Sequence, residues 1–69
     1  MKEKFIKRYM DSINEYFRYT LSDDGKLVRY YIMGEYEKIL HEEFDMSNED
    51  TRNIYNSIYA GYYFKGKEN

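Results

Sequence analysis

The sequence predicts an all-α fold, a small three-helix antiparallel bundle with helices over about 2–21, 26–45 and 48–64. Apolar residues recur at the helical period within each range, and clusters of Ser, Asp, Asn and Gly separate the ranges. Proline is absent, so no helix has a forced kink. Connections of about five residues favour antiparallel neighbours. We therefore expect residues 1–69 to form one helical domain, with a frayed tail from about residue 65.

The first predicted helix has an apolar face and a charged face. At about 100° per residue its apolar side chains fall on one broad arc, whereas the alternation of a strand would place Tyr9 and Met10 on opposite faces. The arc contains Phe5, Ile6, Tyr9, Met10, Ile13, Tyr16, Phe17 and Leu21. The helical period therefore explains residues 2–21 better than a strand does.

A break at residues 22–25 precedes the second predicted helix, because Ser and Asp favour turns and caps and Gly25 accepts a positive φ. Two charged residues, Arg29 and Glu43, fall inside the apolar arc near its ends, where each side chain either reaches solvent or meets a partner. The arc itself contains Val28, Ile32, Met33, Tyr36, Ile39, Leu40 and Phe44.

An α+β alternative stays open at Asp24-Gly25. Residues 17–21 and 26–32 flank this dipeptide, and Asp-Gly between β-forming residues is typical of a β-hairpin. The helical period continues on both sides without a change of phase, and the run 30–33 does not alternate. The pattern therefore favours helices over a hairpin.

The third predicted helix starts at a capping box. Ser47 precedes Asp50 by three residues, and acidic residues suit the positive end of a helix dipole. Gly66 offers a stop after Lys65. The shared face of this helix contains Thr51, Ile54, Tyr55, Ile58, Tyr59 and Tyr62.

The composition predicts a folded, soluble protein. Hydrophobic residues make up 42% and aromatic residues 20%, which is too much for a disordered chain, and the net charge is only −2. The longest apolar run, residues 30–33, is far shorter than the ~18 residues of a membrane span. Cysteine is absent and no export signal is visible in residues 1–10, so we expect a cytoplasmic protein that does not bind membranes.

No motif indicates catalysis or metal binding. His41 and Glu42 begin like a metalloprotease helix, but position 45 holds Asp45 instead of the second histidine. We expect His41 to face solvent in the last turn of its helix. No serine lies in a glycine-flanked elbow, and no glycine-rich phosphate loop is present. The sequence therefore predicts no enzyme, no cofactor, no metal site and no small-molecule substrate.

Ten tyrosines and no tryptophan point instead to contacts between proteins. Half of the tyrosines lie on the apolar arcs and are expected to fill the core. The others lie at the margins of the arcs, and tyrosine and arginine dominate many protein interfaces. The predicted protein-binding residues are Leu27, Tyr30, Tyr31, Arg52, Tyr59 and Tyr63. They predict a noncatalytic regulator, inhibitor or adaptor whose partner is another protein or a second copy of the chain.

Nucleic-acid binding through the first helix is the alternative. The basic residues that would contact phosphates are Lys4, Lys7, Arg8 and Arg18. Asp11 and Glu15 share their face at the spacings of a solvated ion-pair surface. Since these carboxylates would repel phosphate, the sequence favours a protein partner.

Overall fold

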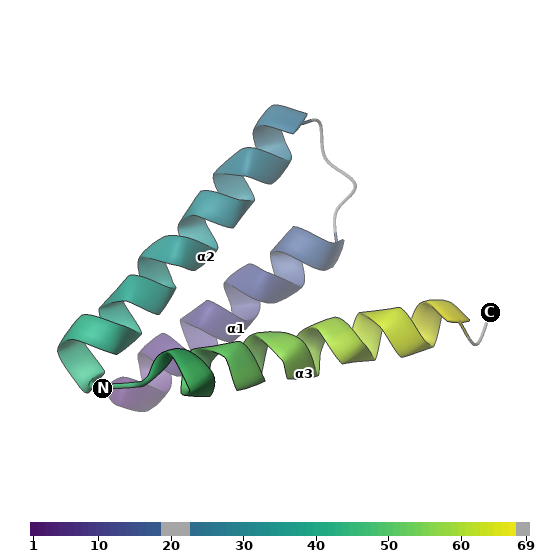
Figure 1. The fold of residues 1–69 in the computed structure, drawn as a ribbon. Coiled ribbons are helices and arrows are strands. Elements are labelled where there is room, and N and C mark those ends of the chain that lie inside the picture. The colour runs from purple at the N-terminus through teal and green to yellow at the C-terminus, as the bar shows by residue number, and fades with distance from the viewer. Residues whose placement is uncertain (19–22, 68–69) are drawn as a thin grey trace.

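The computed structural model describes the backbone of residues 1–18 and 23–67 and most of their side chains, those of Asp23 and 63–67 excepted. Figure 1 shows the fold, a small bundle of three helices. They are α1 (Lys2–Arg18), α2 (Asp23–Phe44) and α3 (Asn48–Lys67). The predicted all-α class is confirmed. The hairpin alternative is wrong, because Lys26 to Ile32 lie within α2 and no strand occurs among the described residues.

The predicted ends of the second and third helices differ from the structure. Residues 19–21, including Tyr19 and Leu21, lie outside the described part of the chain. The second helix begins at Asp23, three residues before the predicted start, and Gly25 has no positive φ. Aspartate in the first turn stabilises a helix start through the dipole, so Asp24 favours this earlier beginning. The third helix continues through Gly66 to Lys67.

Two local devices shape the connection between α2 and α3. Asp45 has a φ of 55°, a left-handed conformation that aspartate tolerates better than most residues, and it follows the last residue of α2. Beyond it the Met46 amide donates a hydrogen bond of 3.1 Å to the Leu40 carbonyl. The chain therefore turns sharply within a few residues, between the end of α2 at Phe44 and the start of α3 at Asn48.

The predicted capping box at the start of α3 is confirmed. The Asp50 amide donates to the Ser47 hydroxyl oxygen at 3.1 Å, and the Ser47 amide donates to an Asp50 carboxylate oxygen at 3.2 Å. These reciprocal bonds satisfy two amides at a helix end that would otherwise lack partners inside the helix.

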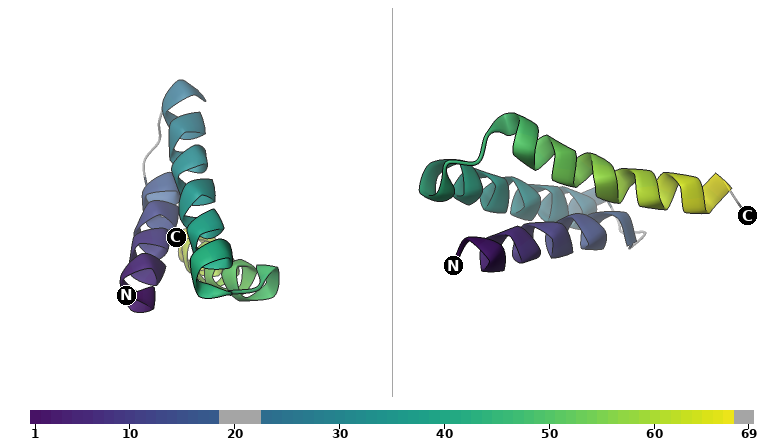
Figure 2. Two further views of the ribbon diagram at one scale, coloured as in Figure 1. Left: turned by 90° about the vertical axis from the view of Figure 1, so that its left-hand side faces the viewer. Right: turned by 90° about the horizontal axis from the view of Figure 1, so that it is seen from below.

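The three helices do not pack equally along their lengths. Figures 1 and 2 show α1 and α2 side by side, running in opposite directions, with α3 crossing them. α2 and α3 meet near their connection and then diverge, and the rest of α3 follows the end of α1. The first half of α2 therefore has α1 on one side and no cover from α3.

A thin core lies where the helices meet. Its buried hydrophobic residues are Tyr9, Ile13, Met33 and Leu40. Around them pack Phe5, Ile6, Tyr16, Phe17, Tyr36, Phe44, Met46, Ile54, Tyr55 and Ile58. These residues come from the predicted arcs, apart from Met46 in the connection. Three predicted arc residues are exposed instead, and each lies at the edge of its arc: Met10, Val28 and Tyr59.

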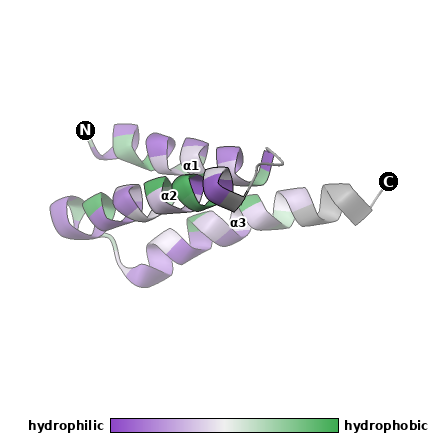
Figure 3. Ribbon diagram, turned by 90° about the horizontal axis from the view of Figure 1, so that it is seen from above, coloured by the Kyte–Doolittle hydropathy of each residue, from purple (hydrophilic) through white to green (hydrophobic). Residues whose placement is uncertain are grey.

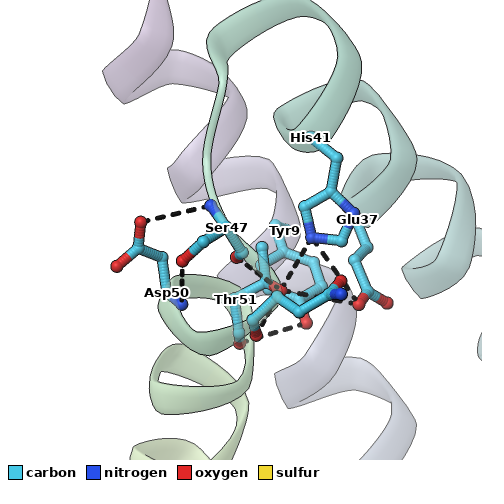
Figure 4. Close-up of polar contacts among 7 residues, drawn as sticks. Tyr9, Glu37, His41, Ser47, Asp50 and Thr51 are labelled. Carbon is cyan, nitrogen blue, oxygen red and sulfur yellow. Dashed lines mark hydrogen bonds and ion pairs between the residues drawn. The ribbon is translucent and has the colours of Figure 1, made fainter.

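A polar junction of Tyr9, Glu37, His41 and Thr51 joins the three helices beside this core (Figure 4). Thr51 is fully buried, and its hydroxyl lies 3.0 Å from His41 Nε2 in a hydrogen bond. The Tyr9 hydroxyl donates to the Thr51 carbonyl at 3.4 Å. Each such bond contributes about 1 kcal/mol net.

The junction corrects the expectation that His41 faces solvent. Its ring is largely covered and bonds to Thr51, and its Nε2 lies 4.0 Å from a Glu37 carboxylate oxygen. On the helical wheel, His41 lies on the side of α2 that faces away from α1. α3 begins on that side and covers the His41 ring.

Burial also changes the acid–base behaviour of Tyr9. Removal from water, reinforced by the nearby Glu37 carboxylate and Tyr55, raises the pKa of the Tyr9 hydroxyl from 10.0 to about 12. The neutral phenol, which donates to Thr51, is therefore the form that the fold favours.

Removing the cap at the start of α3 should destabilise the protein measurably. We expect Ser47→Ala to lower the free energy of unfolding by about 1 kcal/mol, because it leaves the Asp50 amide without its acceptor. Urea denaturation followed by circular dichroism measures the change. Ser57→Ala, at an exposed position inside α3, is the matched control and should stay within about 0.5 kcal/mol. Equal losses in both variants would contradict the role of the cap.

The raised pKa of Tyr9 predicts a loss of stability in alkali. Between pH 10.0 and about 12 the folded chain keeps a proton that the unfolded chain has lost, so stability falls by about 1.4 kcal/mol per pH unit in this window. Tyr9→Phe removes this ionisable group, and its stability should depend less steeply on pH there. Parallel pH profiles of the two proteins in urea denaturation would contradict the assignment.

Candidate functional site

An aromatic cluster fills the space between the end of α1 and the diverging helices. It consists of Tyr16 and Phe17 from α1, Tyr30 from α2, and Tyr55, Tyr59 and Tyr62 from α3. Phe17 is its centre, with ring centroids at 5.1 Å from Tyr16, 5.6 Å from Tyr55 and Tyr62, and 5.7 Å from Tyr59. Edge and tilted contacts at these distances are favourable for aromatic rings.

Polar groups fix the rim of the aromatic cluster. The Tyr62 hydroxyl donates to the Asn14 side-chain oxygen at 3.1 Å, which ties α3 to α1. The Lys26 ammonium lies 5.5 Å from the centre of the Tyr16 ring, and an ion pair of 2.8 Å joins Arg29 to Glu15. Arg29, a charge predicted either to reach solvent or to meet a partner, thus has its partner on α1.

The electrostatics at Tyr55 favour a neutral phenol. Burial, followed by the neighbouring hydroxyls of Tyr16, Tyr30 and Tyr59, raises the pKa of Tyr55 above its ordinary value. An anion at Tyr55 would lose hydration, and the neighbours that raise its pKa are phenols and not cations. The Tyr55 hydroxyl is therefore a poor candidate for a nucleophile.

Two residues predicted to bind protein have packing roles inside this cluster. Tyr59 lies 5.7 Å from Phe17 and stacks on Tyr55 with centroids 6.5 Å apart, yet 48% of its surface stays exposed. Tyr30 packs against Tyr16 at 6.1 Å and is also largely exposed. Each presents one side to the bundle and the other to solvent. Tyr59 therefore has a packing role as well as an exposed side.

The most exposed apolar surface among the described residues of the helices lies on the first half of α2, and we name it the α2 patch. Its members are Leu27, Val28, Tyr30 and Tyr31, with 68%, 57%, 61% and 69% of their surfaces exposed. Figure 3 shows hydrophobic residues on this part of α2. Three of the four were predicted to bind protein; Val28 was assigned to the core. Its place at the edge of the apolar arc was the signal that could have separated it from Met33 and Leu40.

Gly34 borders the α2 patch, and no contact within the chain requires a glycine at this position. It is exposed, it has no positive φ, and a Cβ atom built on it would meet nothing within 4 Å. Glycine inside a helix costs about 1 kcal/mol relative to alanine. The helix carries this cost next to Tyr31, where the missing side chain leaves room at the surface.

The other predicted protein-binding residues lie apart from the α2 patch. Arg52 is exposed in α3, seven residues before Tyr59, and is not a member of the aromatic cluster. Tyr63 belongs to the α3 backbone, but its side chain lies outside the described part of the structure. The structure thus unites Leu27, Tyr30 and Tyr31 and links Tyr59 to them through the aromatic cluster.

The basic residues of the nucleic-acid alternative are mixed with other groups on α1. Lys7 pairs with Asp11 at 3.3 Å, and the Arg8 guanidinium lies over the Phe5 ring at 5.8 Å. Lys4 and Arg18 are exposed near opposite ends of the helix. Since carboxylates interrupt this face, α1 lacks the continuous positive track that phosphate binding uses.

A surface hollow of about 600 Å³ lies between the start of α1 and the end of α2. Phe5 and Phe44, whose rings are 5.5 Å apart, form part of its wall. Its charged residues are Lys4 and Glu43, and Glu43 reaches solvent, one of the two outcomes expected for it. Sequence reasoning missed this hollow, because it depends on which helix ends meet. Within the described residues, no three His, Asp or Glu side chains are grouped so as to hold a metal ion.

Comparison with protein-family models, with curated proteins and with solved structures finds no match to this chain. Among the described helices, none is long and apolar enough to span a membrane. The functional argument therefore rests on the surface itself.

Stability measurements should separate the aromatic cluster from the α2 patch. We expect Phe17→Leu to lower the free energy of unfolding by about 1 to 2 kcal/mol, because it removes four ring contacts. Tyr31→Ser, at an exposed position, should change it by less than about 0.5 kcal/mol. Urea denaturation of both variants tests this division, and a greater loss in Tyr31→Ser than in Phe17→Leu would reverse it.

Proposed function

We propose that this chain is a noncatalytic protein-interaction module that binds its partner through the α2 patch, with the exposed sides of Tyr30 and Tyr59 at the border. The single observation that carries the proposal is the exposure of Leu27, Val28 and Tyr31 together on one helix. Contiguous apolar side chains at a surface are typical of interaction sites. Tyrosine adds a rigid contact with a polar tip.

The energy available from the α2 patch is adequate for specific binding. More than half of Leu27 and of Val28 stays in contact with water, so burying the remainder contributes roughly 1 to 2 kcal/mol for each. Tyr31 has the greatest exposure in the patch and offers a large ring for a central contact. These gains require a partner that presents a complementary apolar surface.

The proposed role is that of a small regulator, inhibitor or adaptor, which acts by covering a surface of its partner. Such a role needs a stable fold and an available face, both of which a three-helix bundle supplies. The lack of cysteine in the sequence is compatible with a reducing compartment, and we place this activity in the cytoplasm as part of the proposal.

Capture from a lysate of the source cells tests the proposal with two matched double variants. The patch variant is Leu27→Ser with Tyr31→Ser; the basic-face control is Lys4→Ser with Arg8→Ser. Immobilised wild-type chain and the control should retain the same protein, and the patch variant should retain at least about tenfold less, because it loses about 1.4 kcal/mol or more of apolar contact. Quantitative mass spectrometry of the eluates gives the ratio.

Salt distinguishes a protein partner from nucleic acid in the same experiment. Apolar binding should survive an increase from about 50 to about 200 mM salt, a range in which phosphate binding falls steeply. Retained nucleic acid that is lost with salt and in the basic-face control, but kept by the patch variant, would contradict the proposal. So would a wild-type chain that retains no partner and stays monomeric in sedimentation.

A further inference from the structure

The outer face of α2 carries opposite charges at equal distances from Tyr31. Asp24 lies seven residues before Tyr31 and Lys38 lies seven residues after it, and all three side chains are exposed. Seven residues are close to two helical turns, so the three residues point in similar directions and span about 10 Å on each side of Tyr31. Lys38 is thus the basic residue of a face on which Glu35 and Glu42 are also exposed, while Asp24 stands at its other end and Tyr31 at its centre.

From this arrangement we infer that the partner of the α2 patch is a second copy of the chain, with the two α2 helices antiparallel about a twofold axis at Tyr31. In such a contact a residue a given number of positions before the axis faces the one equally far after it on the other copy. Asp24 then faces Lys38 of the second copy, and Lys38 faces its Asp24. The two Tyr31 rings meet at the axis. This inference rests on the proposed function and names its partner.

Gly34 fits the same arrangement. Leu27 lies four residues before the axis and Gly34 three after it, and at about 100° per residue both fall on the same side of the line from Asp24 to Lys38. Leu27 of each copy therefore lies beside the glycine of the other, and Val28 falls on the opposite side of that line. A Cβ on Gly34 meets nothing within 4 Å inside one copy, so the space is available to a second helix. Small residues at a contact let two helices approach closely. In the dimer Gly34 lets the two helices approach closely, which gives a reason for a residue that otherwise only destabilises α2.

Self-association is also one route by which a small domain compensates for a thin core. Its buried hydrophobic residues number only four among the described residues. One helix face forms a small interface, so the dimer should be weak and should dissociate between about 10 µM and about 1 mM. A parallel pairing of the two helices would place Asp24 opposite Asp24 and Lys38 opposite Lys38. Because like charges repel, the antiparallel pairing is favoured.

Sedimentation equilibrium of charge-reversed variants tests this geometry. Asp24→Lys alone places two positive charges opposite each other, and Lys38→Asp alone places two negative ones, so each variant should associate at least about fivefold more weakly than the wild type. In an equimolar mixture of the two variants both contacts join opposite charges. The mixture should therefore associate about as tightly as the wild type. Mixing cannot repair a folding defect in either variant, which keeps the result interpretable.

Glycine replacements supply an independent control. Gly34→Gln should raise the midpoint of thermal unfolding, because glutamine favours the helix, and should weaken association at least about tenfold, because its side chain fills the contact. Gly61→Gln, at an exposed glycine of α3 with nothing within 4 Å, should raise the midpoint without changing association.

The inference and the proposed function can fail separately. A wild-type chain that stays monomeric to about 1 mM overturns the second copy as partner, and the proposed function stands if the lysate experiment retains a protein through Leu27 and Tyr31. A dimer that is insensitive to charge reversal and to Gly34→Gln also overturns the inference. Restored association in the mixture, with either variant weak alone, supports it.

Discussion

The buried hydroxyl of Thr51 holds the position on which the rest of the molecule depends. It bonds to His41, while the backbone carbonyl of the same residue accepts from Tyr9, so one residue joins the start of α3 to both other helices. The capping box at Ser47 and the left-handed turn at Asp45 deliver α3 to this point. Away from the junction α3 diverges from α2 and follows α1 (Figures 1 and 2). The direction of α3 has two consequences. The aromatic cluster fills the space beside α1, and the first half of α2 stays uncovered.

The tyrosines have different roles in the polar junction, in the aromatic cluster and on the α2 patch. In the polar junction, Tyr9 is a buried, neutral hydrogen-bond donor. In the aromatic cluster, three tyrosine rings of α3 pack around Phe17 and fill space in a chain that has no tryptophan. On the outer side of α2, Tyr31 has neither task and most of its surface meets water. Tyr59 belongs to both groups, since one side of its ring packs and the other is exposed. The interaction hypothesis therefore depends on α2 more than on α3.

Sequence periodicity predicted the helices well, because the apolar arcs of α1 and α2 reappear as the buried residues Ile13, Met33 and Leu40. It also predicted the cap at Ser47, which depends on two side chains three residues apart. It failed where the outcome depends on the neighbouring helix. A helical wheel gives the direction of His41, but only the path of α3 decides that its ring is covered. The same reason explains Tyr59, whose partner Phe17 is 42 residues away in the sequence.

We propose that the outer face of α2 binds a second copy of this chain, while the aromatic cluster serves the fold. A dilution series of two-dimensional ¹H–¹⁵N NMR spectra, from about 1 mM down to about 10 µM, tests it most directly. The account predicts shifts that change with concentration for residues from Asp24 to Lys38, with constant shifts for Ile13 and Phe17. Spectra that stay unchanged throughout, or changes confined to Lys4, Lys7 and Arg8 on α1, would contradict it.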